Sequence, residues 1–312
     1  MVGFTSIRSR FKAGLEVVIA RSGLAGMLRR RLRHRGVILA YHGIVPHGER
    51  PAGELSLHLA EDQFVAQLSV LGELAEVVSL RDLLRKSPLP GGGAARPRVA
   101  ITWDDAYHGA LTSGLDAVIR HGFPATIFVA PGRLGGQSFW WDRLAQRFNG
   151  MIPVEVRARV LQELAGEDEQ VAAIFEPGAV SPDMPQFARS AEESLLAVAA
   201  SRSGVSVASH SWSHPNLAAV TADRLERELT QSAHWLRERF DSYMPFVAYP
   251  YGLHSPEVRQ GSSRAGYVAG LRIDGGWMPR DGTDQFRVPR LNVPAGLSLD
   301  GFVLRLSGLL AR

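Results

Sequence analysis

The 312-residue chain contains no cysteine, which removes several classes of chemistry at once. Disulfide bonds, thiolate nucleophiles and cysteine-ligated zinc sites are all excluded. Any bound metal must therefore be held by histidine nitrogens and carboxylate oxygens, and ten histidines are available. The sequence also lacks the ~20 consecutive apolar residues of a transmembrane helix and the apolar core of a secretory signal peptide. We therefore expect a cytoplasmic protein.

Acidic residues are nearly absent from the first 36 positions. This segment holds nine Lys or Arg against one acid, Glu16, so its local net charge is +8. Because the whole chain nets +4, the remainder carries −4, and a nucleic-acid-binding role for the body loses its main support. The basic N-terminal arm, residues 1–35, has three open interpretations. It is a solvated helix covering the body, a peripheral contact with anionic lipid at the inner membrane face, or an organellar transit peptide.

Residues 36–312 alternate short apolar runs with helical patterns, which predicts a single α/β domain of βα units around a parallel sheet. The interiors of these runs are almost continuously apolar, as in strands covered on both faces. Residues 149–203 show a helical pattern with no clear strand, so we expect a helical insertion after the fourth strand. The expected strands are Gly36–Tyr41, Ala75–Leu80, Arg98–Trp103, Ala125–Ala130, Val205–Ser209, Pro245–Tyr249, Tyr267–Leu271 and Phe286–Leu291.

Several of these strands end in reactive side chains. His42 follows the first strand, Asp104-Asp105 the third, His210 and His214 the fifth, and Pro250-Tyr251 the sixth. In a parallel barrel the C-terminal ends of the strands converge on one mouth. We therefore expect these side chains to lie close together.

The acidic pair and the two histidines suit a metal site. Adjacent buried carboxylates are costly unless each has a cation or hydrogen-bond donors, so one can bind a metal while the other faces a substrate. The alternative for Asp104 and Asp105 is a helix cap beside a solvated carboxylate. His210 and His214 have the spacing that brings two imidazoles to one ion on a helical turn or tight loop; the alternative is two surface histidines. Two His and one Asp leave positions open on a metal, as in catalytic sites.

Three segments together resemble a known family. Thr102-Trp103-Asp104-Asp105, His210-Ser211-Trp212-Ser213-His214 and Tyr249-Pro250-Tyr251-Gly252 are similar, in this order, to the motifs of the NodB-homology polysaccharide deacetylases, carbohydrate esterase family 4. The opening Tyr41-His42-Gly43-Ile44 looks most like the branch that acts on exopolysaccharides such as poly-N-acetylglucosamine. The resemblance covers roughly residues 36–295. It implies a distorted TIM-like barrel of seven or eight βα units.

The resemblance also implies roles for individual residues. Asp105, His210 and His214 would hold one divalent ion, zinc by preference, with Co²⁺, Ni²⁺, Mn²⁺ and Fe²⁺ as alternatives. Asp104 would be the general base, and the backbone N–H of Tyr251, after Pro250, would face the oxyanion. The implied reaction removes N-acetyl groups from an amino-sugar-containing glycan or glycan precursor. A cytoplasmic enzyme would meet this substrate as a lipid-linked or nucleotide-linked sugar.

The sequence departs from the family pattern in three places. Ala106 stands where the first motif usually ends in Gly, and Ala248 where the third begins with the Arg that orients the base. Arg290-Leu291-Asn292 stands where Leu-x-His would supply the general acid. His42, which matches a histidine of the exopolysaccharide branch, is therefore the candidate acid, with a hydrogen-bonded core histidine as the alternative.

Two tryptophans complete the candidate site. Trp140 and Trp141 follow a Gly-rich loop after the fourth strand, where their rings could stack on sugars or be buried in the core. Two other functions also stay open. A protein that binds sugar on the same barrel without catalysis is supported by the missing Arg and late His. It is opposed by the intact Asp-Asp and His-His set, which a binding protein would not need. The barrel further resembles hydrolases of other small amides, including cyclic ureides.

Overall fold

The computed structural model describes residues 16, 19, 23–85, 96–176, 184–279, 282 and 284–309. Within these residues seven parallel strands form a closed ring, because β1 pairs with β5 along one edge and with β10 along the other. In ring order the strands are β1 (Gly36–Tyr41), β5 (Arg98–Trp103), β6 (Ala125–Val129), β7 (Val205–Ser209), β8 (Tyr243–Ala248), β9 (Ala269–Gly275) and β10 (Val288–Asn292). The expected α/β barrel is confirmed.

The second expected strand is wrong in length. Only β4 (Glu76–Val77) forms, pairing with the first two residues of β5 outside the ring. The chain turns early because the Ser79 side chain accepts a hydrogen bond from the Asp82 backbone N–H and so caps α4 (Leu80–Leu84). A separate two-stranded sheet, which the sequence analysis did not anticipate, joins β2 (Gly43–Val45) to β3 (His58–Ala60).

Helices surround the ring. Thr221, Ser255 and Ser298 each cap a helix through the side-chain oxygen, since each accepts a backbone N–H of the first turn. Besides α4, the described helices outside the insertion are α2 (Gly23–Arg31), α3 (Glu61–Leu74), α5 (Leu115–Arg120), α6 (Trp140–Gln146), α10 (Ala222–Arg239), α11 (Pro256–Arg264) and α12 (Leu299–Leu306), with the short turns η1 (Ala110–Gly114), η2 (Pro131–Arg133) and η4 (Pro250–Gly252).

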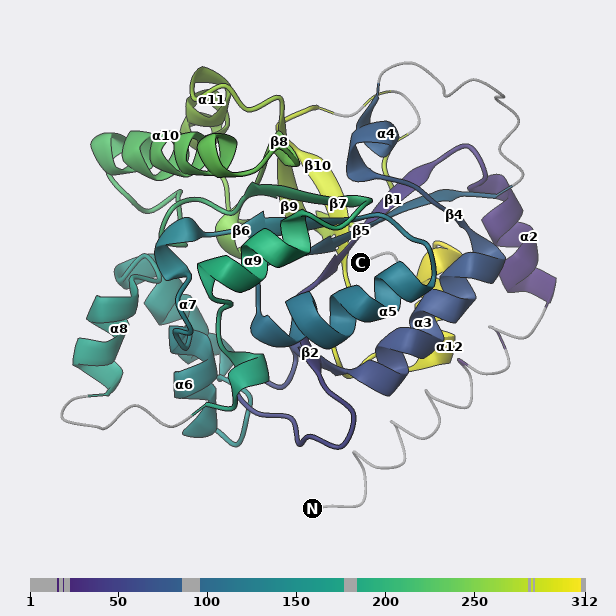
Figure 1. Ribbon diagram of the computed structural model, residues 1–312, viewed down its shortest axis with the longest axis horizontal. Coiled ribbons are helices and arrows are strands. Elements are labelled where there is room, and N and C mark those ends of the chain that lie inside the picture. Colours follow the sequence, from purple (N-terminus) through teal and green to yellow (C-terminus); the bar gives the residue numbers. More distant parts are fainter. Residues whose placement is uncertain are drawn as a thin grey trace.

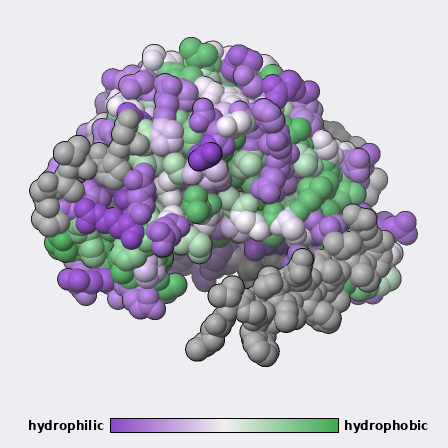
Figure 2. Space-filling view, turned by 90° about the horizontal axis from the view of Figure 1, so that it is seen from below, coloured by the Kyte–Doolittle hydropathy of each residue, from purple (hydrophilic) through white to green (hydrophobic). Residues whose placement is uncertain are grey.

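The insertion after β6 is helical, as expected. In its described part it consists of α7 (Val154–Glu163), α8 (Asp168–Phe175), the turn η3 (Gln186–Ala188) and α9 (Glu193–Ala200). With α6 before them, α7 and α8 lie at one side of the barrel, and α2 lies at the other (Figure 1). Among the described helices none combines the length and apolar character needed to cross a membrane. The face in Figure 2 carries small apolar areas among hydrophilic side chains.

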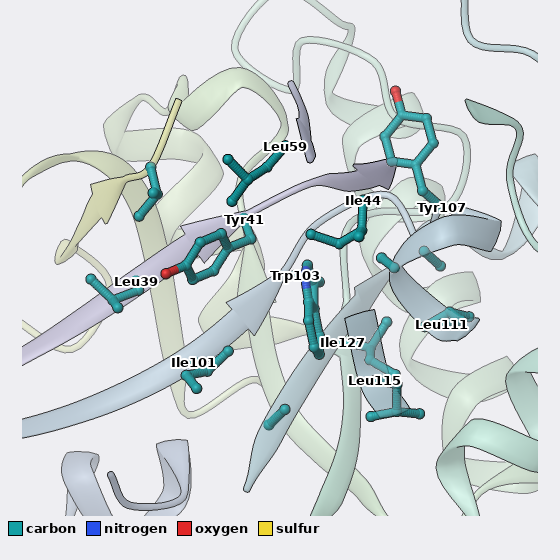
Figure 3. Packing of buried hydrophobic residues seen from close by; sticks show 14 of the residues in the cluster. Leu39, Tyr41, Ile44, Leu59, Ile101, Trp103, Tyr107, Leu111, Leu115 and Ile127 are labelled. Atoms are coloured by element: carbon teal, nitrogen blue, oxygen red, sulfur yellow. The ribbon is translucent and has the colours of Figure 1, made fainter. Parts of the chain in front are cut away.

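Alternate residues of the strands enter two different cores. Leu39, Ile101, Trp103 and Ile127 point outward and pack with side chains of the surrounding helices, such as Leu115 (Figure 3). The residues between them form a second cluster that draws on all seven ring strands and therefore fills the barrel interior. Its strand members are Ile38, Ala100, Phe128, Ala208, Phe246, Ala248, Ala269, Leu271 and Val288.

The same alternation decides which polar residues face inward. Counting onward in steps of two from the interior positions Ala100, Ala208 and Val288 reaches Asp104 after β5, His210 after β7 and Arg290 within β10. Since all seven strands are parallel, these positions meet at the C-terminal end of the barrel. The fold thus places the candidate chemistry at one mouth.

Candidate active site

Asp105, His210 and His214 come together as a buried trio. Their ligand atoms all lie within 4.8 Å of one another. The two histidine Nε2 atoms are 3.1 Å apart, and Asp105 Oδ1 lies 3.2 Å from His214 Nε2 and 3.7 Å from His210 Nε2. Three donors converging on one point are consistent with one divalent metal ion.

The chemistry of these three side chains fits a cation. Asp105 Oδ1 is buried without a hydrogen-bond partner. Burial, together with the charges of Asp104 and Asp142, raises its pKa well above the ordinary value, as happens when a carboxylate lacks a compensating positive charge. Burial also lowers the pKa of His210 and His214, which favours the neutral, metal-binding imidazole.

Each histidine ring is fixed in its own way. His210 Nδ1–H donates to the Ala248 carbonyl at 2.8 Å, which leaves Nε2 free to bind a metal. His214 is held by aromatic rings instead, with the Trp141 and Tyr251 ring centroids 4.9 Å and 4.7 Å from its own. The segment joining them is a loop rather than a helical turn, because Ser211 and His214 have left-handed φ values of 64° and 66°.

Asp104 is held by a residue outside the three motifs. Arg290 of β10 donates from Nη1 and Nη2 to the two carboxylate oxygens at 2.7 Å and 2.8 Å. The Arg290 side chain is fully buried, its Nε donates to the Arg272 carbonyl, and its guanidinium carbon lies 5.2 Å from the Phe128 ring centroid. Arg290 therefore makes the contact that the sequence analysis found missing at Ala248.

The Arg290 contact separates the two adjacent carboxyls electrostatically. Burial by itself would raise the pKa of Asp104, but the charges of Arg290 and His210 and the Arg290 hydrogen bonds hold it well below the ordinary value. Asp105, one residue later, has its pKa raised. Two neighbouring acids with pKa values pushed apart are typical of sites that give them different tasks.

His42 lies beside this pair. Its Nε2 is 3.9 Å from Asp104 Oδ2 and its side chain is 14% exposed. Burial lowers the pKa of His42 to about 4, although the Asp104 charge opposes that change. His42 is therefore a neutral imidazole at neutral pH in the described protein, within reach of the Asp104 carboxylate.

Of the remaining candidate residues, some line the cavity and others are buried in the core. Tyr251 has a φ of 58°, and its hydroxyl donates to the His214 carbonyl and accepts a hydrogen bond from Trp140 Nε1. Trp141 forms part of the cavity wall, but Trp140 is 1% exposed and offers no ring face to a sugar. Pro250 is also buried and shapes the turn that presents Tyr251.

A cavity of about 310 Å³ connects the site to solvent, which is the low end of the range for small-molecule pockets. Leu161 and Arg157 of α7 line it, so the insertion forms part of its wall. Ser56 and Leu57 contribute from the loop before β3. The expected site residues that line it are His42, Asp104, Asp105, Trp141, His210, His214 and Tyr251.

Sequence reasoning missed Arg290 although a signal was present. The residue lies within an otherwise apolar strand, Val288–Asn292, and a buried guanidinium needs a partner. Its position two residues after the interior Val288 points it into the barrel. No comparable signal identifies Leu57 or Arg157 as cavity residues, because loop and insertion placement depends on tertiary packing.

A family model and individual known proteins are similar to this chain. The model of the family described as "Polysaccharide deacetylase" matches residues 91–270. The putative polysaccharide deacetylase YxkH of Bacillus subtilis is 25% identical over 99 residues, which are 32% of this chain and 35% of that protein. This chain therefore matches about a third of the length of that relative.

Three solved structures are similar in fold. The Streptococcus pyogenes deacetylase PplD in complex with acetate has a TM-score of 0.60 at 18% identity, covering 87% of this chain and 98% of that one. A de-N-acetylase from Aggregatibacter actinomycetemcomitans has a TM-score of 0.61 at 14% identity, with 87% and 99% covered. IcaB from Ammonifex degensii has a TM-score of 0.59 at 14% identity, with 89% and 97% covered. On the family match, the barrel and the buried Asp-His-His trio, the chain belongs to the polysaccharide deacetylase family.

Proposed function

We propose that this protein is a metal-dependent N-deacetylase of an amino-sugar-containing glycan or glycan precursor. The observation that carries the proposal is the contrast between Asp104 and Asp105. One carboxylate is paired with Arg290, and the other lies with two histidines where a divalent cation fits. A hydrolase that acts through metal-activated water uses both a base and a metal-binding set, whereas a sugar-binding protein needs neither.

Amide hydrolysis requires one proton to leave water and one to reach the departing nitrogen. A divalent ion held by Asp105, His210 and His214, with zinc preferred for this ligand set, would polarise the acetamide carbonyl and acidify water. Asp104 accepts the proton from the attacking water, and Arg290 keeps its carboxylate oriented and ionised. His42 Nε2 is 3.9 Å from Asp104 Oδ2, so the proton that Asp104 has taken from water passes through the neutral His42 imidazole to the amine nitrogen. The backbone N–H of Tyr251 faces the oxyanion.

The alternative of a sugar-binding pseudo-enzyme loses one of its two supports. It drew on the absence of an arginine at position 248, and Arg290 makes that contact from another strand. The other support, Asn292 in place of the late histidine, stands. Asn292 lines the cavity, but a carboxamide neither takes up nor releases a proton, whereas an imidazole does both, so His42 carries the acid role in our proposal.

The test is acetate release from a panel of N-acetylated substrates after metal reconstitution. The panel should contain free oligosaccharides and nucleotide-linked and lipid-linked N-acetyl sugars, since we propose a glycan precursor met in the cytoplasm or at the inner membrane face. Release from any of them supports the proposal. Metal binding with no release from any sugar substrate would leave a binding protein, and cleavage of simple amides or ureides alone would favour the other hydrolase class.

A further inference from the structure

The loop that carries both histidines has an unusual pattern of backbone hydrogen bonds. The His210 N–H donates to the Val129 carbonyl at 2.7 Å. The N–H groups of Ser211 and His214 donate to the side-chain oxygens of Ser209 and Ser211. None of these acceptors is a backbone carbonyl of the loop, so side-chain oxygens and the neighbouring strand β6 set its shape.

The two central N–H groups of the loop share one acceptor. Trp212 N and Ser213 N donate to Oε2 of Glu228 at 2.9 Å and 2.8 Å. The Ser213 hydroxyl donates to the other carboxylate oxygen, Oε1, at 2.7 Å. Glu228 lies on α10, outside all three motifs, and is 2% exposed. One buried carboxylate thus accepts three hydrogen bonds from two successive loop residues.

Glu228 is itself anchored. Arg224, one turn earlier on α10, donates from Nε to Glu228 Oε1 at 2.9 Å and from Nη2 to the Ser213 hydroxyl oxygen at 2.9 Å. Arg224 Nη2 also lies 3.7 Å from Oε1 of Glu167 in the insertion. The carboxylate therefore has a cation on one side and the loop on the other. Together they compensate its charge in a buried position.

The loop needs such a clamp because its backbone is strained. Ser211 and His214 are non-glycine residues in the left-handed region, a conformation that costs about 1 kcal/mol or more per residue and persists only where surrounding contacts impose it. Relaxing either residue would rotate the peptide planes between His210 and His214. Their Nε2 atoms, now 3.1 Å apart, would then no longer point at one position.

We propose that Glu228 is a positioning residue of the metal centre, which holds the strained loop so that His210 and His214 converge on one ion. The inference rests on the proposed metal site and adds to it a residue that contacts neither metal nor substrate. Residues in this relation to a metal change its affinity by about 10- to 100-fold when they are replaced.

The experiment measures Zn²⁺ affinity of the full chain by competition with a chromophoric chelator, and the visible spectrum of the Co²⁺-loaded protein, which reports ligand geometry. Glu228→Ala should weaken Zn²⁺ binding about 10- to 100-fold and alter the Co²⁺ spectrum. Glu228→Gln keeps one oxygen for the two backbone N–H groups, so its loss should be smaller. Glu226→Ala, which removes the same charge from an exposed position on α10, should bind as the unaltered protein does.

The possible results distinguish a failure of the proposed metal site from a failure of the inference about Glu228. If the unaltered protein bound no metal, the proposed function itself would fail. If it bound metal and folded Glu228→Ala had the same affinity and spectrum with only a lower Tm, Glu228 would be structural and the inference wrong. If Glu228→Ala does not fold, the same two measurements are made on Glu228→Gln and Ser213→Ala. The Ser213 variant removes one of the three hydrogen bonds between the loop and Glu228.

Discussion

Arg290 and Asp104 form a bidentate ion pair inside the barrel, although 186 residues separate them in sequence. Breaking a buried pair by removing one partner typically costs about 3–5 kcal/mol, the scale of one large-to-small core substitution. The pair therefore connects the stability of the barrel to the ionisation of the proposed base.

Replacing Arg290 by Gln should impair the base by raising its pKa. Without the guanidinium, burial raises the pKa of Asp104, so the carboxylate is protonated over more of the acidic range. The acid limb of the kcat/KM profile should move to higher pH, and activity on that limb should fall about tenfold for each pH unit by which the limb moves. Rate measurements against pH test this, with exposed Arg227→Gln as control. A uniformly lower profile with an unmoved acid limb would contradict it.

Replacing Asp104 by Asn should separate catalysis from metal binding. The amide cannot take a proton from water, so turnover should fall by at least ~10²-fold. The bound metal should remain, because Asp105, His210 and His214 are intact. Metal content and acetate release are measured on the same preparation. An unimpaired variant would remove the base from the proposed mechanism.

The metal itself should bind through the buried trio. Purified protein should carry about one divalent ion per chain, with zinc preferred for two His and one Asp. Adding metal at 100 times its Kd should stabilise the fold by about 2.7 kcal/mol, because the unfolded chain does not preserve the site. Elemental analysis and thermal unfolding test both. If the His210→Ala, His214→Ala double variant kept its metal, the site would lie elsewhere.

Replacing His42 by Ala should lower kcat most on substrates whose leaving group needs a proton. An amine cannot depart unprotonated, whereas an aryl acetate releases a stable phenolate without help. We expect a large loss on the N-acetyl substrate and a small loss on the aryl ester. Comparing kcat on both substrates for the same preparation is the measurement. Equal losses on the two substrates would instead make His42 a core histidine that shapes the site.

The basic arm is predicted to be dispensable for chemistry. Most of residues 1–35 lie outside the described residues, but α2 lies across the barrel from α7, which lines the cavity (Figure 1). Full-length protein should sediment with anionic vesicles at low salt and be released at high salt, since each basic side chain near the surface is worth roughly 1 kcal/mol within a Debye length. A chain without the first 34 residues should stay in the supernatant and keep its acetate release. Unfolding of this truncation would make the arm a structural cap.

The sequence by itself determined the barrel and the candidate metal ligands. Apolar runs with polar ends predict parallel strands, and the run from Arg98 to Trp103 is reproduced residue for residue. The pairing of Asp105 with His210 and His214 followed from their places after such strands, because parallel strands bring their ends together in any closed sheet. These features depend on local pattern and on a general rule of topology.

The tertiary structure decided which partners those residues have. Arg290 makes the contact missing at position 248, and the closure of the ring places β10 and β5 on either side of β1. Glu228 contacts the loop that carries His210 and His214 because α10 packs on β7. Burial of Trp140 was likewise settled by packing. Such contacts join residues far apart in the chain, and no local pattern encodes which side chain will compensate a buried charge or constrain a strained loop.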